Sequence, residues 1–110
     1  MAEPAWRPDP AAAAETNVGR FMAAHGIDTF DELLTRSIEE PAWFWGAVVA
    51  FLGIPFATPY DDVLDESDGV PWARWFTGGR TNLASICLDR WVVESPDRIA
   101  LKSLISLMPP

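Results

Sequence analysis

The segment Pro41–Leu52, PAWFWGAVVAFL, is the strongest constraint on how this chain can fold. It contains no charged side chain, and Gly53, Pro55 and Pro59 follow it closely. Proline suits the first turn of a helix, where its missing N–H is not needed, and glycine and proline end helices. We therefore predict a helix that is apolar on every face, and such a helix is normally covered on every face. The rest of so short a chain offers little cover, so we expect a companion domain or a second copy of the chain to supply it.

Aromatic residues are abundant for a chain of this length. There are six Trp and six Phe residues among 110 residues. Each ring buries roughly 150–250 Å² when it is covered, and a small domain has a limited interior. We predict that two aromatic clusters pack in the core or against a neighbouring domain: Trp43, Phe44 and Trp45, and Trp72, Trp75 and Phe76.

The charge balance argues against a nucleic-acid partner. The chain carries 16 acidic and 8 basic side chains, which gives a net charge of −8. Proteins that bind a phosphate backbone cluster Lys and Arg residues, and no such stripe occurs here. Stacking of bases on the Trp72 cluster is disfavoured for the same reason.

The cysteine count and the hydropathy of the chain indicate the cellular compartment in which it is expected. The single cysteine, Cys87, has no partner for an internal disulfide, which fits a reducing cytoplasm. With one histidine in the chain we expect no metal cluster. The N-terminus lacks a basic start followed by an apolar core, so no secretory signal is predicted. No membrane span is expected either, because spanning needs about 20 apolar residues.

Two further helices precede the apolar one. The alanine-rich segment Ala11–His25 is predicted to be helical, with Gly26 as its end. A second helix is predicted over Thr29–Glu39, because Thr29 and Glu32 have the spacing of a capping box. In that motif each side chain accepts the free backbone N–H of the other residue.

The second half of the chain is predicted to hold short strands and one helix. Val63–Leu64 forms a short strand or 3₁₀ turn, and Arg74–Phe76 an edge strand. Thr81 or Asn82 then caps a helix that runs to about Val93, and Ile99–Leu101 is expected to be a strand. The fold class is therefore mainly α with a few short strands.

Candidate chemical sites each have a simpler structural explanation. The turn Gly78–Gly79 with Arg80 before a helix could bind an anion, but the phosphate-loop pattern is absent and a tight turn is expected. His25 suits a helix C-terminus, and Cys87 is expected to be a small buried apolar residue. The acidic run Asp61–Asp68 lacks the spacing of a calcium loop and is expected to be solvated. The charged pair Asp89 and Arg90 could bridge to a neighbouring segment.

Several short motifs, in order, resemble the N-terminal region of AMP-forming acyl-CoA synthetases of the acetyl-CoA synthetase type. The resemblance extends over about residues 21–101. The matching residues are Ser37-Ile38-Glu39, Pro41, Phe44-Trp45, Val63-Leu64-Asp65, Trp75-Phe76, Gly78-Gly79, Asn82, Cys87-Leu88-Asp89-Arg90 and Ile99-Ala100-Leu101.

The resemblance implies that this chain is the N-terminal helical segment of a larger α/β adenylate-forming enzyme. Such enzymes use Mg-ATP to convert a carboxylic acid to an acyl-adenylate and then transfer the acyl group to coenzyme A. The ATP loop and the catalytic lysine of the family lie downstream of the matching region. We therefore expect no catalytic, cofactor-binding or metal-binding residue in this chain, and we expect the chain alone to be inactive. The candidate site is a domain-packing surface made of the two aromatic clusters together with Asp89 and Arg90.

The chain also departs from the family pattern. Trp91 stands where relatives often have His, and the segment 102–110 replaces an expected polar strand and turn. We therefore expect an extended arm over residues 1–10, the synthetase-type region over 11–101 and an atypical tail over 102–110. A truncated or frameshifted gene, or an isolated fragment, would explain this organisation. The alternative is a free-standing acidic helical interaction module that forms a homodimer. The expected partner is accordingly the remainder of a synthetase large domain, or a second copy of the chain.

Overall fold

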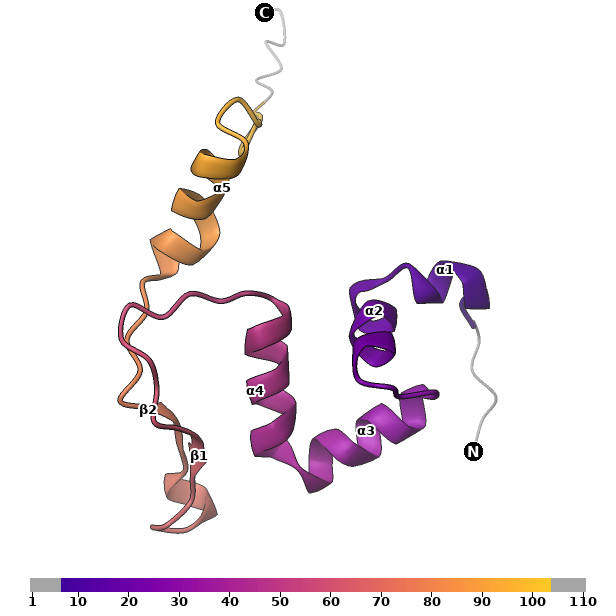
Figure 1. Ribbon diagram of the computed structural model, residues 1–110, viewed down its shortest axis with the longest axis vertical. Helices are drawn as coiled ribbons and strands as arrows, with labels where there is room; N and C mark the ends of the chain where they lie inside the picture. The colour runs from indigo at the N-terminus through magenta and orange to yellow at the C-terminus, as the bar shows by residue number, and fades with distance from the viewer. Residues whose placement is uncertain (1–6, 104–110) are drawn as a thin grey trace, which may run out of the picture.

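The computed structural model describes residues 7–103 and has the expected fold class, mainly helical with one small antiparallel sheet. In chain order the elements are α1 (Pro10–Ala14), α2 (Asn17–Ala24), α3 (Phe30–Glu39), α4 (Pro41–Phe51), β1 (Asp62–Asp65), the 3₁₀ turn η1 (Val70–Trp72), β2 (Arg74–Thr77), the π-helical turn η2 (Ser85–Asp89) and α5 (Arg90–Glu94). Helices α2, α3 and α4 form one group, the hairpin lies beside α4, and η2 and α5 extend away from both (Figure 1).

The N-terminal alanine segment forms two helices, so the prediction of one continuous helix is wrong. Helix α1 ends at Ala14, and Thr16 starts α2 by accepting the backbone N–H of Gly19 at 3.0 Å. The Thr16 hydroxyl also donates to the carbonyl of Ala13 at 2.6 Å. Threonine competes with the helix for backbone partners in this way, and the alanine propensity does not overcome it.

The helix ends that glycine was expected to set are confirmed. Gly26 and Gly53 follow α2 and α4 with φ angles of 64° and 58°. These left-handed angles cost glycine little and other residues more. Thr29 caps α3 as predicted, by accepting the N–H of Glu32 at 3.2 Å, but Glu32 accepts the N–H of Asp28 rather than that of Thr29.

The two predicted strands pair into an antiparallel hairpin. The register places Asp62 opposite Thr77, Leu64 opposite Trp75 and Asp65 opposite Arg74. The hairpin packs on α4, and Gly46 allows the close approach. A Cβ atom at that position would lie 3.2 Å from Cγ2 of Val63.

The last helix begins at Leu83 and continues through η2 into α5. Asn82 caps it as expected, because its side-chain oxygen accepts the N–H of Ala84 at 2.9 Å. The predicted strand Ile99–Leu101 is wrong: these residues have no regular structure and are exposed. A strand needs a partner to accept its hydrogen bonds, and nothing in the described range 7–103 pairs with this segment.

The core is small, and the molecule is open. Among residues 7–103 the buried ones are Phe21, Ile27 and Leu33, with Met22, Trp43, Phe44, Ala47 and Val48 packed around them. The Cα radius of gyration is 19.5 Å, whereas a compact domain of this length has about 13 Å. Much apolar surface is therefore left without cover.

The predicted arm and tail fall largely outside the described residues. Residues 1–6 of the arm and 104–110 of the tail are not described. Arg7–Asp9 have no regular structure, but Pro10 already belongs to α1, and Lys102 and Ser103 are irregular. The division of the chain at residues 10 and 101 stays a prediction.

Candidate docking surface

Trp43 and Phe44 are half-buried against the core of the chain itself. The ring of buried Phe21 lies 6.4 Å from that of Trp43 and 6.0 Å from that of Phe44, between ring centroids. The Arg36 guanidinium lies over the Trp43 ring, 3.5 Å from its centroid. Arg36 in turn forms an ion pair with Glu40 at 3.6 Å. These two aromatic side chains therefore contribute to the fold and are only partly available to a partner.

Trp45 and Trp75 bring the two aromatic clusters together. Their ring centroids lie 6.3 Å apart with the rings nearly perpendicular, an arrangement that aromatic pairs favour. Both remain open to solvent, with 45% and 46% of their surface exposed. Trp45 also contacts Phe44 at 5.2 Å, so one continuous row of rings runs from the core to the hairpin.

Phe76 joins the row of rings, with its centroid 6.5 Å from that of Trp75, to an aromatic box that sequence reasoning did not find. Its ring lies 5.9 Å from that of Phe56 and 5.2 Å from that of Tyr60. Gly79 closes the box, because a Cβ atom there would lie only 2.9 Å from Phe56 Cε1. Phe76 itself has a φ of 49°, which a bulky residue adopts only when its surroundings hold it. The two prolines near Phe56 and the Gly78–Gly79 pair marked a turn, but they did not show which rings would meet.

Trp72 stands apart from both groups. It lies in η1 at the tip of the hairpin, with 72% of its surface exposed. The tip is held by Arg74, whose Nη2 lies 2.7 Å from a carboxylate oxygen of Asp65 and 3.4 Å from one of Asp68. The backbone N–H of Ser67 donates to the Asp65 carboxylate at 3.0 Å. The hydrogen bonds from the backbone and side chain of Ser67 are the main cause that holds the pKa of Asp65 below its ordinary value, and the charge of Arg74 adds to them.

Asp89 and Arg90 do not act as a pair. Asp89 accepts a hydrogen bond from the Ser85 hydroxyl at 3.1 Å, within the last helix. Arg90 instead donates to the backbone carbonyls of Leu52 and Gly53, at 3.3 and 3.0 Å. The expected bridge to another segment is made by Arg90, and it runs to the end of α4.

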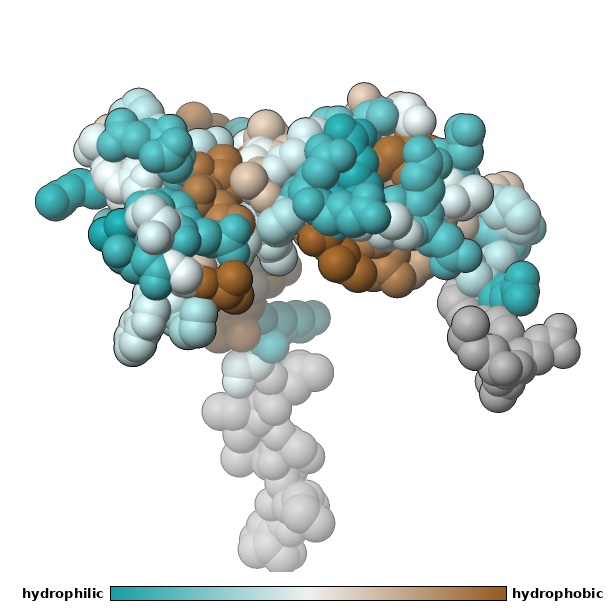
Figure 2. All heavy atoms as spheres, turned by 90° about the horizontal axis from the view of Figure 1, so that it is seen from below, coloured by the Kyte–Doolittle hydropathy of each residue, from teal (hydrophilic) through white to brown (hydrophobic). Residues whose placement is uncertain are grey.

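Two hollows extend the apolar surface. One, of about 170 Å³, lies among α2, α3 and α4 beside Phe21, Phe44 and Phe51. The other, of about 460 Å³, lies between the last helix and the irregular segment after it, beside Leu88 and Trp91. The side of the molecule drawn in Figure 2 shows two apolar areas, one towards the hairpin and one towards α3 and α4, each bordered by polar residues.

The Gly78–Gly79 turn and His25 have the structural roles that we expected, whereas the expectation for Cys87 is wrong. The N–H groups of Gly79 and Arg80 donate to the carbonyls of Phe76 and Thr58 and are not free for an anion. His25 caps the C-terminus of α2, and its ring lies 4.5 Å from that of Phe21. Cys87, expected to be buried, is exposed because nothing in the described chain covers that face of the last helix.

The part of the chain that the structure describes holds neither a metal-binding cluster nor a membrane-spanning helix. Among residues 7–103 no three His, Cys, Asp or Glu side chains gather closely enough to hold a metal ion. Likewise, none of the helices described there has the length and hydropathy to cross a bilayer.

Comparison with known proteins agrees with the resemblance carried by the motifs. Residues 30–87, just over half of the chain, match the family described as acetyl-coenzyme A synthetase N-terminus. The chain belongs to this family. Within the match lie α3, α4, the hairpin and most of η2, which is the part that carries the row of rings and the aromatic box.

Relatives of this acetyl-coenzyme A synthetase N-terminus chain are much longer proteins. A propionate–CoA ligase of Escherichia coli K12 is 41% identical over 78 residues, which are 71% of this chain and 12% of the ligase. An acetoacetyl-CoA synthetase of Macaca fascicularis is 35% identical over 103 residues, 87% of this chain and 15% of the relative. In structure, the chain matches an acetoacetyl-CoA synthetase from Streptomyces lividans with a TM-score of 0.74 and 31% identity. That match covers 87% of this chain and 16% of the synthetase. The chain therefore spans about one-seventh of the length of these relatives.

Proposed function

We propose that this chain is a non-catalytic N-terminal piece of an ATP-dependent, AMP-forming acyl-CoA synthetase. The observation that carries the proposal is the structural match to one part of a far larger synthetase. The chain that makes this match has an open fold with uncovered apolar surface. The relatives are named for propionate and acetoacetate. Acids of this short-chain kind, acetate included, are the substrate class that we propose for the parent enzyme.

The proposed role of the chain is to pack on the large domain of that enzyme. Trp45 and Trp75 would supply the centre of the contact and Trp72 a separate anchor at the hairpin tip, because exposed aromatic rings are the side chains that most often anchor interfaces. Trp43, Phe44 and Phe76 would support these rings from beneath, since they are half-buried within the chain. Arg90 would hold the last helix in place, and Asp89 would lie at the edge of the contact, where it is exposed.

We place the chemistry of the parent enzyme outside this chain. Adenylate formation and coenzyme A transfer need positive charge and a bound metal near the phosphates. The net charge of this chain is −8. ATP, magnesium and coenzyme A would accordingly be bound by other parts of the synthetase. A cytoplasmic location is proposed on the single cysteine, Cys87, which lies exposed and unpaired.

A second candidate function is a free-standing acidic module that pairs with its own copy. The apolar hollow among α2, α3 and α4 favours it, because a second copy could cover that surface. The net charge of −8 on each copy opposes it, since two copies would bring like charges together.

A binding experiment tests the first candidate. The chain is titrated by calorimetry into Escherichia coli propionate–CoA ligase from which the matching N-terminal region has been deleted. We expect binding with a Kd of about 10 μM or tighter and a gain in ligase activity. The Trp45→Glu variant should bind at least about tenfold more weakly, because it places a charge at the centre of an apolar contact. Thr35→Glu, at an exposed position of α3, serves as the control and should bind like the parent chain.

Two outcomes would contradict the proposal. Failure of the chain to bind the shortened ligase at 100-fold the expected Kd is one of them. The other is a monodisperse homodimer in light scattering with a cooperative melting transition, which would favour the second candidate. Turnover of ATP by the chain alone would reject both candidates.

A further inference from the structure

The last helix is joined to the rest of the molecule at very few points. Within residues 7–103, the two hydrogen bonds of Arg90 are the only ones that link residues 83–103 to anything before Asn82. Most of this segment is exposed, whereas Arg90 is half-buried and its Nε atom is shielded from solvent. The side chain is therefore inserted against α4 while its neighbours are not.

The atoms that Arg90 contacts explain why an arginine suits this position. Nη1 donates to the carbonyl oxygens of Leu52 and Gly53, 3.3 and 3.0 Å away, just beyond the C-terminus of α4. The last carbonyls of a helix lack partners within the helix, and the negative end of the helix dipole lies there. A cation that donates to them satisfies both requirements. The Cζ atom of the guanidinium lies 4.5 Å from the ring centroid of Trp91.

We propose that Arg90 is a positioning residue that fixes the direction of the last helix by capping α4 from a distance. Both the paired hydrogen bonds and the contact with Trp91 suit a guanidinium, because this planar group presents several N–H donors at once and stacks on an aromatic ring. The loop before the hairpin and the chain after it are already joined at Thr58 and Arg80, and by the Thr81 hydroxyl to the Pro55 carbonyl at 2.6 Å. Arg90 extends this junction by nine residues and so determines where Leu88, Trp91 and Val92 face.

The proposal concerns the chain itself and does not require a companion domain. It can fail while the synthetase assignment holds, and the reverse is also true. A spectroscopic distance measurement within the chain therefore tests it separately from binding.

Spin labels at two exposed helical positions report on the direction of the last helix. Val93→Cys and Ala23→Cys place the labels on α5 and α2, and Cys87→Ala removes the native thiol. In this background we expect a narrow distance distribution by double electron–electron resonance. Arg90→Met keeps the length of the side chain but removes the donors, and should broaden the distribution at least about twofold because charge-assisted hydrogen bonds are lost. Arg90→Lys keeps the charge and should restore part of the narrow distribution.

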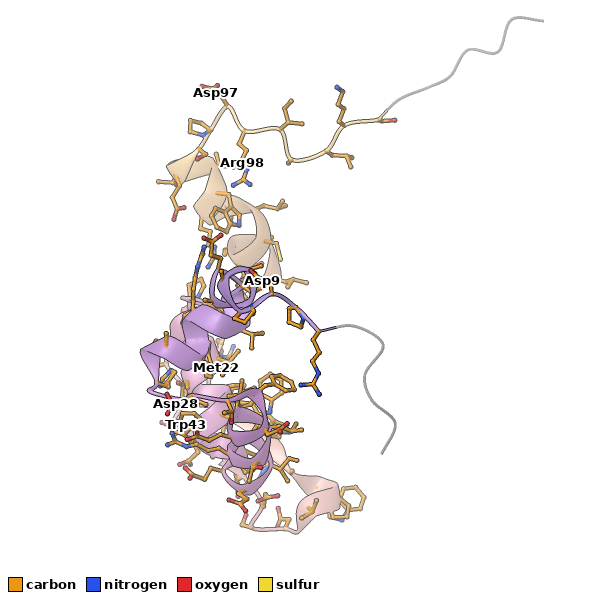
Figure 3. The ribbon with its side chains drawn as sticks, turned by 90° about the vertical axis from the view of Figure 1, so that its right-hand side faces the viewer. Asp9, Met22, Asp28, Trp43, Asp97 and Arg98 are labelled. Atoms are coloured by element: carbon orange, nitrogen blue, oxygen red, sulfur yellow. The ribbon has the colours of Figure 1, made fainter. Side chains whose placement is uncertain are left out.

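Controls separate the capping contact from general loosening. Arg98→Met removes a guanidinium from the turn after α5, well away from Trp43 and Met22 (Figure 3), and should leave the distribution as narrow as the background. Helix content by circular dichroism should be the same in all variants. An Arg90→Met distribution as narrow as the background, at unchanged helix content, would overturn the proposal.

A measurement on the unmutated chain decides the question if Arg90→Met loses helix content. The guanidinium protons of Arg90 should exchange with water several times more slowly than those of Arg98, because the former are hydrogen-bonded and shielded. Equal exchange rates for the two arginines would overturn the proposal.

Discussion

The helical group α2–α4 and the segment that follows it are stabilised in different ways. All three buried residues, Phe21, Ile27 and Leu33, lie in or beside α2 and α3, and no described residue after Leu33 is buried. The hairpin and the last helix are held instead by strand pairing, the Asp65–Arg74 ion pair, the aromatic box and the Arg90 contact. Hydrophobic burial is the dominant stabilising term in folding, whereas each hydrogen bond contributes modestly. The first region is therefore stabilised mainly by burial, while the second keeps its geometry through individual polar and aromatic contacts.

The strongest test of this comparison is the removal of the central ring of the core. Phe21→Ala should destabilise the helical group by about 3–5 kcal/mol, because it removes a buried ring that contacts α4. Urea unfolding followed by circular dichroism measures the loss. The matched control is Phe30→Ala, at a ring with 61% of its surface exposed, which should cost far less. Equal losses in the two variants would show that the helical group has no core of its own.

A clash in the aromatic box should act on the second region alone. Gly79→Ala places a Cβ atom 2.9 Å from Phe56 Cε1 and 3.0 Å from Tyr60 Cβ, and overpacking of this kind costs about 1–3 kcal/mol. Tyr60 is the single tyrosine of the chain, so its ring signals in an NMR spectrum report on the box directly. Backbone signals of α2 and α3 should stay in place. Movement of those signals by the same extent would contradict the separation of the two regions.

Loss of a helix cap should weaken the first region by a smaller amount. Thr29→Ala removes the side-chain oxygen that accepts the N–H of Glu32, and such losses cost about 1 kcal/mol. Amide hydrogen exchange along α3 measures the effect, with Thr35→Ala in the same helix as the control. An equal effect of both variants would mean that the cap at Thr29 adds nothing beyond the side chain itself.

The smallest effect that we expect is a pH dependence of the hairpin. Because the pKa of Asp65 is lower in the folded chain than its ordinary value, the carboxylate stabilises the hairpin above about pH 4 and loses this effect as the pH falls further. NMR signals of Trp75 and Thr77, on the paired strand, should show the change. Asp65→Asn should remove it, and Asp97→Asn, outside the hairpin, should not. A hairpin that loosens with rising pH instead would reverse the sign and reject the explanation.

Local signals in the sequence predicted most of the elements. The ends at Gly26 and Gly53, the cap at Thr29 and the strands near Val63 and Trp75 were all found, because capping, turn chemistry and strand propensity act within a few residues. The break at Thr16 does not follow from the helix propensity of the alanines, because the Thr16 hydroxyl bonds to the backbone on both sides of it and ends one helix while it caps the next. The strand at Ile99 was predicted wrongly because its pattern was local, while pairing needs a second strand.

The candidate surface was predictable as a set of residue types but not as an arrangement. The abundance of Trp residues indicated that aromatic surface would need cover, and the motifs identified the family. The contact of Trp45 with Trp75, the contact of Phe76 with Tyr60 and the exposure of Cys87 could not be read from the pattern. Each depends on where segments far apart along the chain come to lie.

By itself, the sequence determined most of the helices and both strands of the hairpin, the apolar character of α4 and the membership of the acetyl-coenzyme A synthetase N-terminus family, because propensity, capping and motif order are carried by neighbouring residues. Only the tertiary structure decided which rings lie inside, which lie open, and that Arg90 caps a helix 37 residues before it. Such contacts form only when loop closure and packing bring distant residues together, and that balance is set by the whole chain.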